Sequence, residues 1–339
     1  MSKTQAALAE LAERRHLSPE LMRAAMSEIM GGQADPAQIG GFLMALRIKG
    51  ETPAEIAAAA EVMRQFAARV EIDREGLTDI VGTGGDGASL FNVSTASAFV
   101  AAAAGVRVAK HGNRAVSSKS GAADVLEAAG CRLDLSPEQV AGLIEELGVG
   151  FLFAPQHHSA MKHAIGPRRA LGLRTLFNLL GPLTNPALAP NQVLGVFSAS
   201  LVRPMAEVMQ TLGARHVMVV HSDDGLDEIS PVAATSVAEL RDGEIHEYRL
   251  DPRELGVQMT SLAALSVSDS AASLALIEQA LGGTAGEAAD IVSLNAGAAI
   301  YVGGKAPTLE AGVRQAREIL AAGFGLERLK AYAQRTREL

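Results

Sequence analysis

Apolar positions recur at helical spacing over the first seventy residues. Ile39, Phe42, Leu43 and Leu46, for example, fall on one face of a helix. Three such segments follow a capping residue and a proline, the pairing that favours a helix start: Ser18-Pro19, Asp35-Pro36 and Thr52-Pro53. We therefore predict that residues 1–70 contain helices only.

From about residue 77, short apolar runs alternate with helical patterns. The runs predict strands at 78–82, 106–110, 149–153, 192–197 and 215–221. Between them we expect helices from Ser94 to Gly105 and over 137–147, and Asp242-Gly243 predicts an antiparallel hairpin. The last eighty residues return to helical spacing. This order predicts an α/β fold in which a small all-helical domain accompanies a mixed, mainly parallel central sheet with helices on both faces.

Composition narrows the class of protein. The chain has 339 residues, no Trp and one cysteine, Cys131, so an internal disulfide is excluded and a cytoplasmic location is expected. Cys131 is expected to be a buried thiol at the start of a strand. The net charge of −8 argues against general nucleic-acid binding, and no apolar run predicts a membrane span.

The stretch DIVGTGGDG at 79–87 matches a dinucleotide fingerprint through Gly82, Gly84 and Gly87. Such a site needs an acidic residue about twenty positions later, and needs the glycines themselves to open the helix. Here no residue from Gly87 to Ala123 is acidic, and the next helix is expected only from Ser94. A P-loop is excluded too, because no Gly-Lys-Ser/Thr follows. The context therefore argues against a dinucleotide.

The same stretch still favours an anion. Glycines let backbone amides approach a ligand, and Ser94 and Thr95 lie at an expected helix N-terminus. Four cations lie nearby with no acidic neighbour in sequence: Arg107, Lys110, Arg114 and Lys119. The combination predicts a ligand with more than one phosphate group, against the simpler interpretation of a solvated charged surface.

Two further segments carry candidate chemistry. HSDDGLDEIS at 221–230 places four carboxylates after a predicted strand, where magnesium bound to a phosphate ester could find ligands. Residues 157–186 hold Arg168, Arg169 and Arg174, which could bind a carboxylate. His157, His158 and His163 are interpreted as polar lining or packing, and Asn178 to Pro186 as a rigid turn between domains.

Together these segments resemble the anthranilate phosphoribosyltransferase family. The resemblance is carried by DIVGTGGDG, FNVSTAS, VAKHGNR, SSKSG, AADVLEA, RRALGLRTLFNLLGPLTNP and DGLDEIS, and it begins at GGFLMALRIKGET. It implies a helical domain of residues 1–70 with a helical part from about 168–190, and a donor-binding α/β domain of 71–339. It also implies a homodimer formed through the small domain. An association with a glutaminase or anthranilate synthase is left open.

The resemblance implies transfer of a phosphoribosyl group from 5-phosphoribosyl 1-diphosphate to the amine of anthranilate, with magnesium, two ions per site, held by Ser94, Asp227 and Glu228. Anthranilate would contact Gly82, Asn113 and Arg168. The donor would be held by Gly82, Gly85, Asp86, Leu90, Asn92, Val93, Ser94, Thr95, Lys110, His111, Gly112, Asn113, Arg114, Ala115, Val116, Ser117, Ser118 and Ala122. No residue is expected to act as a catalytic acid, base or nucleophile.

Two positions depart from the family pattern. Leu90 and Ala122 each replace a hydroxyl residue, and a lost neutral hydrogen bond is worth about 0.5–1.5 kcal/mol, so weaker donor binding is expected. Two alternatives remain at this point. One is a phosphoribosyltransferase or nucleoside phosphorylase with another aromatic acceptor. The other is a non-catalytic relative that binds nucleic acid.

Overall fold

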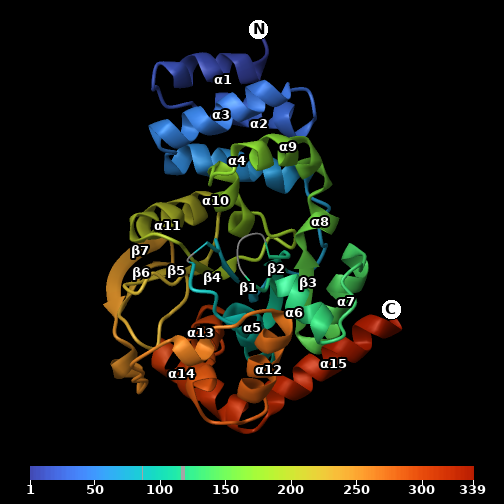
Figure 1. Ribbon diagram of the computed structural model, residues 1–339, viewed down its shortest axis with the longest axis vertical. Helices are drawn as coiled ribbons and strands as arrows, with labels where there is room; N and C mark the ends of the chain where they lie inside the picture. Colours follow the sequence, from blue (N-terminus) through green and yellow to red (C-terminus); the bar gives the residue numbers. More distant parts are fainter. Residues whose placement is uncertain (86, 116–118) are drawn as a thin grey trace.

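The computed structural model describes residues 1–85, 87–115 and 119–339. The chain begins with a helical bundle and continues into a larger α/β domain (Figure 1). Four helices open the bundle: α1 (Lys3–Ala12), α2 (Pro19–Met30), α3 (Pro36–Lys49) and α4 (Pro53–Phe66). The predicted starts of α2, α3 and α4 are confirmed. The side chains of Ser18, Asp35 and Thr52 each accept a hydrogen bond from a first-turn amide.

One seven-stranded sheet organises the α/β domain, in the order β3-β2-β1-β4-β5-β6-β7. The strands are β1 (Leu77–Gly82), β2 (Arg107–Gly112), β3 (Val149–Phe153), β4 (Asn191–Gly195), β5 (His216–Ser222), β6 (Thr235–Arg241) and β7 (Glu244–Leu250). The first five are parallel, and β6 and β7 add the predicted antiparallel hairpin. Its turn residues, Asp242 and Gly243, have φ of 53° and 82°, which suits a two-residue hairpin turn.

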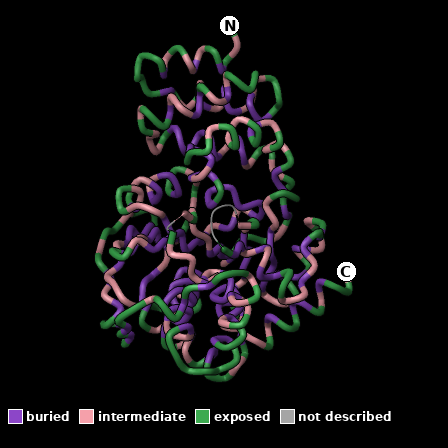
Figure 2. Tube along the Cα trace, in the orientation of Figure 1, coloured by how far each residue is buried: buried purple, intermediate pink, exposed green. Residues whose placement is uncertain are grey.

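Helices cover both faces of the sheet, as predicted. One face packs against α5 (Val93–Ala103) together with α12 (Ser270–Leu281), α13 (Glu287–Val302), α14 (Leu309–Ala321) and α15 (Phe324–Glu338). The opposite face packs against α10 (Leu176–Leu183) and α11 (Val202–Thr211), and this second core continues into the bundle (Figure 1). Buried segments accordingly run through both parts of the chain (Figure 2).

The remaining helices link these layers. They are α6 (Ala122–Ala128), α7 (Pro137–Leu147), α8 (Ala154–His157) and α9 (Lys162–Leu171). The predicted limits of α7 are confirmed, from the Ser136 cap to Gly148, whose φ of 72° ends the helix. Although α9 lies far along the chain, it packs against α2 and α3, and α10 packs against α3 and α4.

Three local expectations are corrected by the structure. Helix α5 begins at Val93, so Ser94 lies in its first turn and Asn92 is the N-terminal cap. Cys131 is buried as expected, but it lies in an irregular segment between α6 and α7 rather than a strand. Residues 176–183 form α10 instead of a turn, because burial of Leu176, Phe177, Leu179, Leu180 and Leu183 overrides the internal Pro182.

Candidate active site

The strand order places a crevice between β1 and β4. After β1 the chain crosses to the face covered by α5, whereas after β4 it crosses to the face covered by α11. Two neighbouring parallel strands whose connections leave in opposite directions open a crevice at their carboxyl ends, the usual ligand site of such sheets. The glycine loop begins at this point.

Two glycines at the crevice let an acidic segment lie directly on the strand ends. Gly82 of β1 and Gly195 of β4 are paired in register. A Cβ on Gly82 would lie 2.3 Å from Asp227 Oδ2, and one on Gly195 would lie 1.6 Å from the backbone oxygen of Asp227. Any side chain at either position would therefore displace Asp227. The fold thus places the carboxylate of Asp227, from residues 221–230, against the glycine loop.

Hydrogen bonds fix this contact. The amide of Gly84 donates to Asp227 Oδ2 at 2.7 Å, and the amide of Thr83 donates to Gly195 O at 2.9 Å. Gly84 and Gly85 have φ of 65° and 83°, a backbone region that glycine adopts without strain. These hydrogen bonds therefore hold the loop against β4 and against the acidic segment. We call the crevice at the carboxyl ends of β1 and β4 the switch-point crevice.

The N-terminus of α5 faces the same loop region. Asn92 connects three segments, since its Oδ1 accepts from the hydroxyls of Ser120 and Ser273 and its Nδ2 donates to Ser120 O. In the first turn, Thr95 Oγ1 is buried without a hydrogen-bond partner among the described residues. A helix N-terminus offers free amides and favours negative charge.

Lys110 is buried beneath the site rather than displayed on it. Its side chain extends from β2, and its Nζ donates to Ile80 O at 2.6 Å and Ser94 Oγ at 3.0 Å. Burial lowers the pKa of Lys110, while the negative charges of Asp79, Glu228 and Asp227 oppose that shift. The ammonium thus joins β1 to the start of α5 through hydrogen bonds. It is also attracted by the negative charges of the acidic segment.

Two of the four cations that have no acidic neighbour in sequence meet acidic partners in the fold. Arg107 lies at the amino end of β2 and pairs with Glu145, while Arg114 pairs with Glu127 and Asp124. These acids lie outside the stretch Gly87–Ala123, although Asp124 directly follows it. Lys119 is exposed.

Asp124 shapes the loop that follows β2. Its Oδ2 accepts the amides of Ala115 and Gly121, both at 2.9 Å, on either side of the undescribed residues 116–118. Burial raises the pKa of Asp124, but these two amides and Arg114 outweigh it and lower the pKa overall. Asn113 is exposed at the start of the loop, and its Oδ1 accepts the amide of Arg114.

The four carboxylates of residues 221–230 divide into two pairs. Asp223 pairs with Arg249, and Asp224 accepts the hydroxyl of Ser230 at 2.6 Å, so both serve the hairpin region. Asp227 and Glu228 instead act on Lys110. Within the described ranges, no group of three or more His, Cys, Asp or Glu side chains is placed to hold a metal ion.

Arg174 reaches the glycine loop from the bundle side, and Arg168 lies on α9, which packs against the bundle. The guanidinium of Arg168 is half-buried over the ring of Phe177, 5.1 Å from its centre, and burial lowers its pKa. Arg174 donates to Gly85 O, stacks 4.4 Å from the centre of Phe197, and its own carbonyl accepts from Arg47. Arg169 is exposed.

His157 and His158 are buried and His163 is half-buried, in line with their interpretation as lining or packing, whereas His111, predicted to contact the donor, is buried beside His158. His111 Nδ1 donates to Gly181 O at 3.1 Å, and the centre of its ring lies 5.1 Å from that of His158. Burial, with a smaller contribution from His157, lowers the pKa of His158 to about 4. Burial likewise places the pKa of His111 well below its ordinary range, so these rings are neutral at pH 7.

The remaining predicted positions lie around the same loops. Leu90 bridges to Ser266, Val93 is buried, Gly112 ends β2, and Ala122 begins α6. A Cβ on Gly112 would lie 2.6 Å from the Phe151 ring. The predictions for Asp86, Val116, Ser117 and Ser118 fall outside the described residues.

Two buried residues of the site were missed by the sequence analysis. Asp79 accepts the His111 amide at 3.1 Å and the Asn185 side chain at 2.8 Å, and Asn185 also donates to Ala109 O. Burial raises the pKa of Asp79 to about 6. A charged residue inside an otherwise apolar strand is the signal that could have found it.

Comparison with known proteins agrees with this geometry. Residues 5–67 match the helical bundle domain of a glycosyl transferase family, and residues 74–326 match its a/b domain. An anthranilate phosphoribosyltransferase of Alkalilimnicola ehrlichii is 58% identical over 335 residues, covering 99% of each chain. The chain belongs to the anthranilate phosphoribosyltransferase family. The resemblance drawn from its motifs is confirmed.

Other relatives extend the comparison. The enzyme of Cellvibrio japonicus is 59% identical and covers 98% of both chains. The crystal structure of the Thermus thermophilus enzyme superposes with a TM-score of 0.93 at 46% identity, covering 98% of this chain and 99% of that one. The Saccharomyces cerevisiae enzyme, solved in complex with PRPP and Mg, has a TM-score of 0.90 at 27% identity over 99% of this chain and 98% of its own. The predicted fold class is confirmed.

Proposed function

We propose that this chain transfers the phosphoribosyl group of 5-phosphoribosyl 1-diphosphate to the amine of anthranilate, releasing pyrophosphate. The observation that carries the proposal is the switch-point crevice, where Gly82 and Gly195 seat Asp227 against a glycine loop beside a helix N-terminus. Such a site suits a ligand with several phosphate groups. The acceptor follows from this chain's membership of the family, whose relatives are anthranilate phosphoribosyltransferases.

The donor site is assigned to the segments around this crevice. The first turn of α5 offers backbone amides to a phosphate group, and Asn92 and Asp124 hold the neighbouring loop in place. Lys110 supports the same site from below by bonding to Ser94. Arg114 lies on the loop after β2, where Glu127 and Asp124 balance its charge. Leu90 and Ala122 offer no hydroxyl, so we expect weaker donor binding than a serine or threonine would give.

The residues present fit magnesium shared with the diphosphate. Ser94 Oγ and the carboxylates of Asp227 and Glu228 are oxygen donors of the kind that Mg²⁺ prefers, and metal bound to a phosphate ester needs only one or two protein carboxylates. Because Gly82 and Gly195 have no side chains, Asp227 can lie directly against the ends of β1 and β4. When bound, magnesium would stabilise negative charge on the leaving pyrophosphate. We propose two ions per site.

The acceptor is assigned to the bundle side of the crevice. Anthranilate is a planar carboxylate, and a guanidinium can bind it through two parallel hydrogen bonds. Arg168 is half-buried, and its guanidinium lies over the ring of Phe177, 5.1 Å from the ring centre. Asn113 and Gly82 complete the proposed contacts. A nucleobase has no carboxylate to bind there, and this distinguishes anthranilate from the alternative aromatic acceptors.

The proposed chemistry needs positioning more than acid–base groups. The bond between C1 of the ribose and the pyrophosphate oxygen breaks, while the anthranilate nitrogen forms the new bond to C1 and then loses a proton. An aromatic amine is already neutral at pH 7, so a strong base is unnecessary. The site's amides and cations stabilise the charge that develops on the leaving group.

Loss of anthranilate fluorescence on addition of donor and magnesium tests the proposal. We expect loss that requires all three components and yields N-(5-phosphoribosyl)anthranilate by mass spectrometry. Unchanged fluorescence with a folded chain would contradict it.

Two proposals concern organisation. We assign residues 1–70 and about 168–190 to one functional unit and 71–339 to the other, supported by the packing of α9 and α10 on the bundle. We also propose a homodimer through the bundle. Its support is three exposed apolar side chains on α3, on α9 and just after α9: Ile48 at 67%, Ile165 at 45% and Leu173 at 53%.

A further inference from the structure

A cavity of about 640 Å³ lies at the opposite edge of the sheet from the crevice. Its lining includes the segments that precede three strands, with Arg74 and Glu75 before β1, residues 188–190 before β4, and Arg215 before β5. The candidate active site lies at the carboxyl ends of β1, β4 and β5. A six-residue strand is about 20 Å long, so the two sites are separated by the length of the strands.

Four arginines gather in this cavity: Arg64, Arg69, Arg74 and Arg215. The chain as a whole carries a net charge of −8, so this concentration of cations is local. Among the residues that the structure describes, none of the four forms an ion pair, since no carboxylate oxygen lies within 4.0 Å of its guanidinium nitrogens. Of the two acids in the lining, Glu61 is paired at 2.7 Å with Arg23, which lies outside the cavity.

Arg64 is held in place at the inner wall. Its Nε donates to Leu183 O at 2.7 Å, which ties the end of α4 to the end of α10. Burial lowers the pKa of Arg64 to about 10; Glu61 opposes that shift, and the positive charges of Arg69 and Arg74 add to it. A bound anion would relieve the repulsion between these cations.

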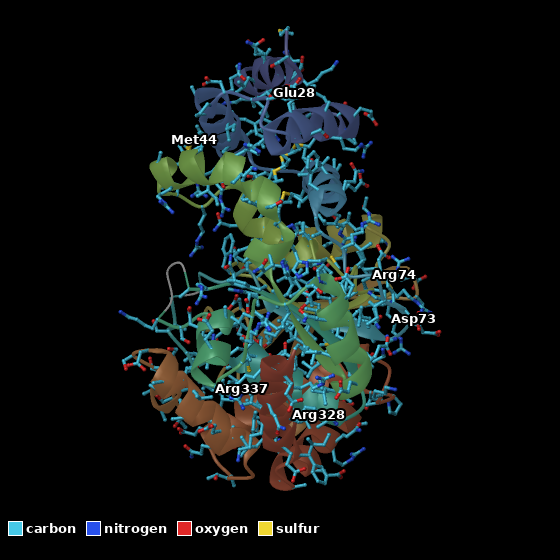
Figure 3. All side chains as sticks on the ribbon, turned by 90° about the vertical axis from the view of Figure 1, so that its right-hand side faces the viewer. Glu28, Met44, Asp73, Arg74, Arg328 and Arg337 are labelled. Carbon is cyan, nitrogen blue, oxygen red and sulfur yellow. The ribbon has the colours of Figure 1, made fainter. Side chains whose placement is uncertain are left out.

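The two walls come from different parts of the fold. One is the end of α4 and the connection that follows it, carrying Arg64, Arg69 and Arg74; the other is the turn between α11 and β5, carrying Arg215. Backbone hydrogen bonds brace both, from Val70 to Pro186 O at 3.2 Å and from Arg215 to Pro190 O at 2.8 Å. Arg74 lies at the level where the bundle meets the α/β domain (Figure 3).

We propose that this cavity is a second anion site, which binds a small molecule with several phosphate groups between the helical bundle and the α/β domain. The volume lies in the range of small-molecule sites and exceeds what one phosphate would fill. Guanidinium groups bind phosphate oxygens through paired hydrogen bonds, and four of them match a polyphosphate. A ligand held by both walls would fix the position of the bundle relative to the sheet.

Calorimetric titration of the full chain with tripolyphosphate, without divalent cations, tests this site. Wild type should show a binding event that is at least tenfold weaker in Arg69→Gln/Arg74→Gln and in Arg215→Gln, since a hydrogen bond to a charged group contributes about 1.5–3 kcal/mol. Any binding at the crevice should persist in both. Arg314→Gln/Lys330→Gln, which removes two exposed cations elsewhere, should match wild type.

The two variants change opposite walls, and circular dichroism melting confirms that each is folded. Isotherms identical to that of Arg314→Gln/Lys330→Gln would overturn the proposal. Weakening in one variant alone would contradict a site shared by the two parts of the fold. Absence of the binding event from wild type would also overturn it, in favour of a solvated basic surface. None of these outcomes depends on the reaction at the crevice.

Discussion

Arg168 is the side chain on which the proposed choice of acceptor depends. Its guanidinium is half-buried and stacked on Phe177, whereas the adjacent Arg169 is exposed. A hydrogen bond to a charged group contributes about 1.5–3 kcal/mol, so Arg168→Ala should raise the KM for anthranilate roughly ten- to a hundredfold. The KM for the donor should change little. Steady-state kinetics with each substrate varied in turn measures both constants.

Arg169→Ala is the matched control and should behave as wild type. If Arg168→Ala weakens the donor and leaves anthranilate saturation unaltered, Arg168 belongs to the phosphate site instead.

His158 predicts how stability depends on pH. Its pKa falls from about 6.5 in an unfolded chain to about 4 in the folded protein, chiefly through burial. The unfolded chain therefore binds more protons below pH 6.5, and the free energy of unfolding falls as the pH falls from 6.5 towards 4. Between pH 7 and pH 5 this residue should account for a loss of about 2 kcal/mol.

Urea unfolding at the two pH values measures that loss. His158→Asn should lose about 2 kcal/mol less than wild type between pH 7 and pH 5, while His246→Gln, at an exposed position, should lose as much as wild type. An equal loss in all three proteins would show that His158 is protonated in the folded state.

At the scale of elements, the loop after β2 depends on one carboxylate. Asp124 accepts the amides of Ala115 and Gly121 and so closes the loop on both sides. Asp124→Ala should raise the KM for the donor at least tenfold, because two hydrogen bonds to a charged group, each contributing about 1.5–3 kcal/mol, are lost. Donor titration of initial rates measures the effect.

Glu127→Ala separates loop closure from charge. Glu127 also pairs with Arg114, but no described backbone amide bonds to its side chain. We expect a donor KM close to that of wild type. A rise as large as that of Asp124→Ala would mean that the charge of the pair, and not the closure of the loop, controls donor binding.

Elements with local signals could be predicted from the sequence. The helix starts at Ser18, Asp35 and Thr52 follow from side-chain caps, and the hairpin follows from Asp242-Gly243, because each depends on residues within one turn. Helix α10 was missed because Gly181-Pro182 is typical of a turn, yet tertiary burial of its leucines decided the outcome.

Contacts between distant segments could not be predicted in the same way. Arg114 meets Glu127, and Arg107 meets Glu145, only after α6 and α7 have packed on the sheet. Arg174 gave no local sign that it would reach Gly85. The motifs assigned the glycine loop and Asp227 to one site. The pairing of Gly82 with Gly195 beneath Asp227 became visible only in the folded sheet.

At the scale of the whole molecule, the exposed apolar side chains of the bundle predict self-association. Ile48→Glu places a charge in the proposed interface and should convert a dimer to a monomer, because a buried unpaired charge is costly. Phe324→Glu is the control, since Phe324 is 51% exposed on α15 at the other end of the molecule. Sedimentation equilibrium measures both. A wild-type monomer, or a dimer in both variants, would contradict the proposed interface.

The parts of the molecule also meet at the active site. Arg47 of the bundle bonds to the carbonyl of Arg174, whose guanidinium bonds to Gly85 in the α/β domain. Arg168 comes from the bundle side as well, whereas the glycine loop and Asp227 come from the sheet. The proposed reaction therefore requires both domains. The bundle side contributes the proposed acceptor-binding residue, and the sheet side contributes the proposed donor-binding residues.

The rate of pyrophosphate release from 5-phosphoribosyl 1-diphosphate, compared between anthranilate and uracil as acceptors, tests this account most directly. With magnesium present, we predict release with anthranilate, equal in amount to the anthranilate consumed, little release with uracil, and none with anthranilate after chelation of the metal. Release that is faster with uracil, or that continues at the same rate without magnesium, would contradict the proposed acceptor or the proposed metal site.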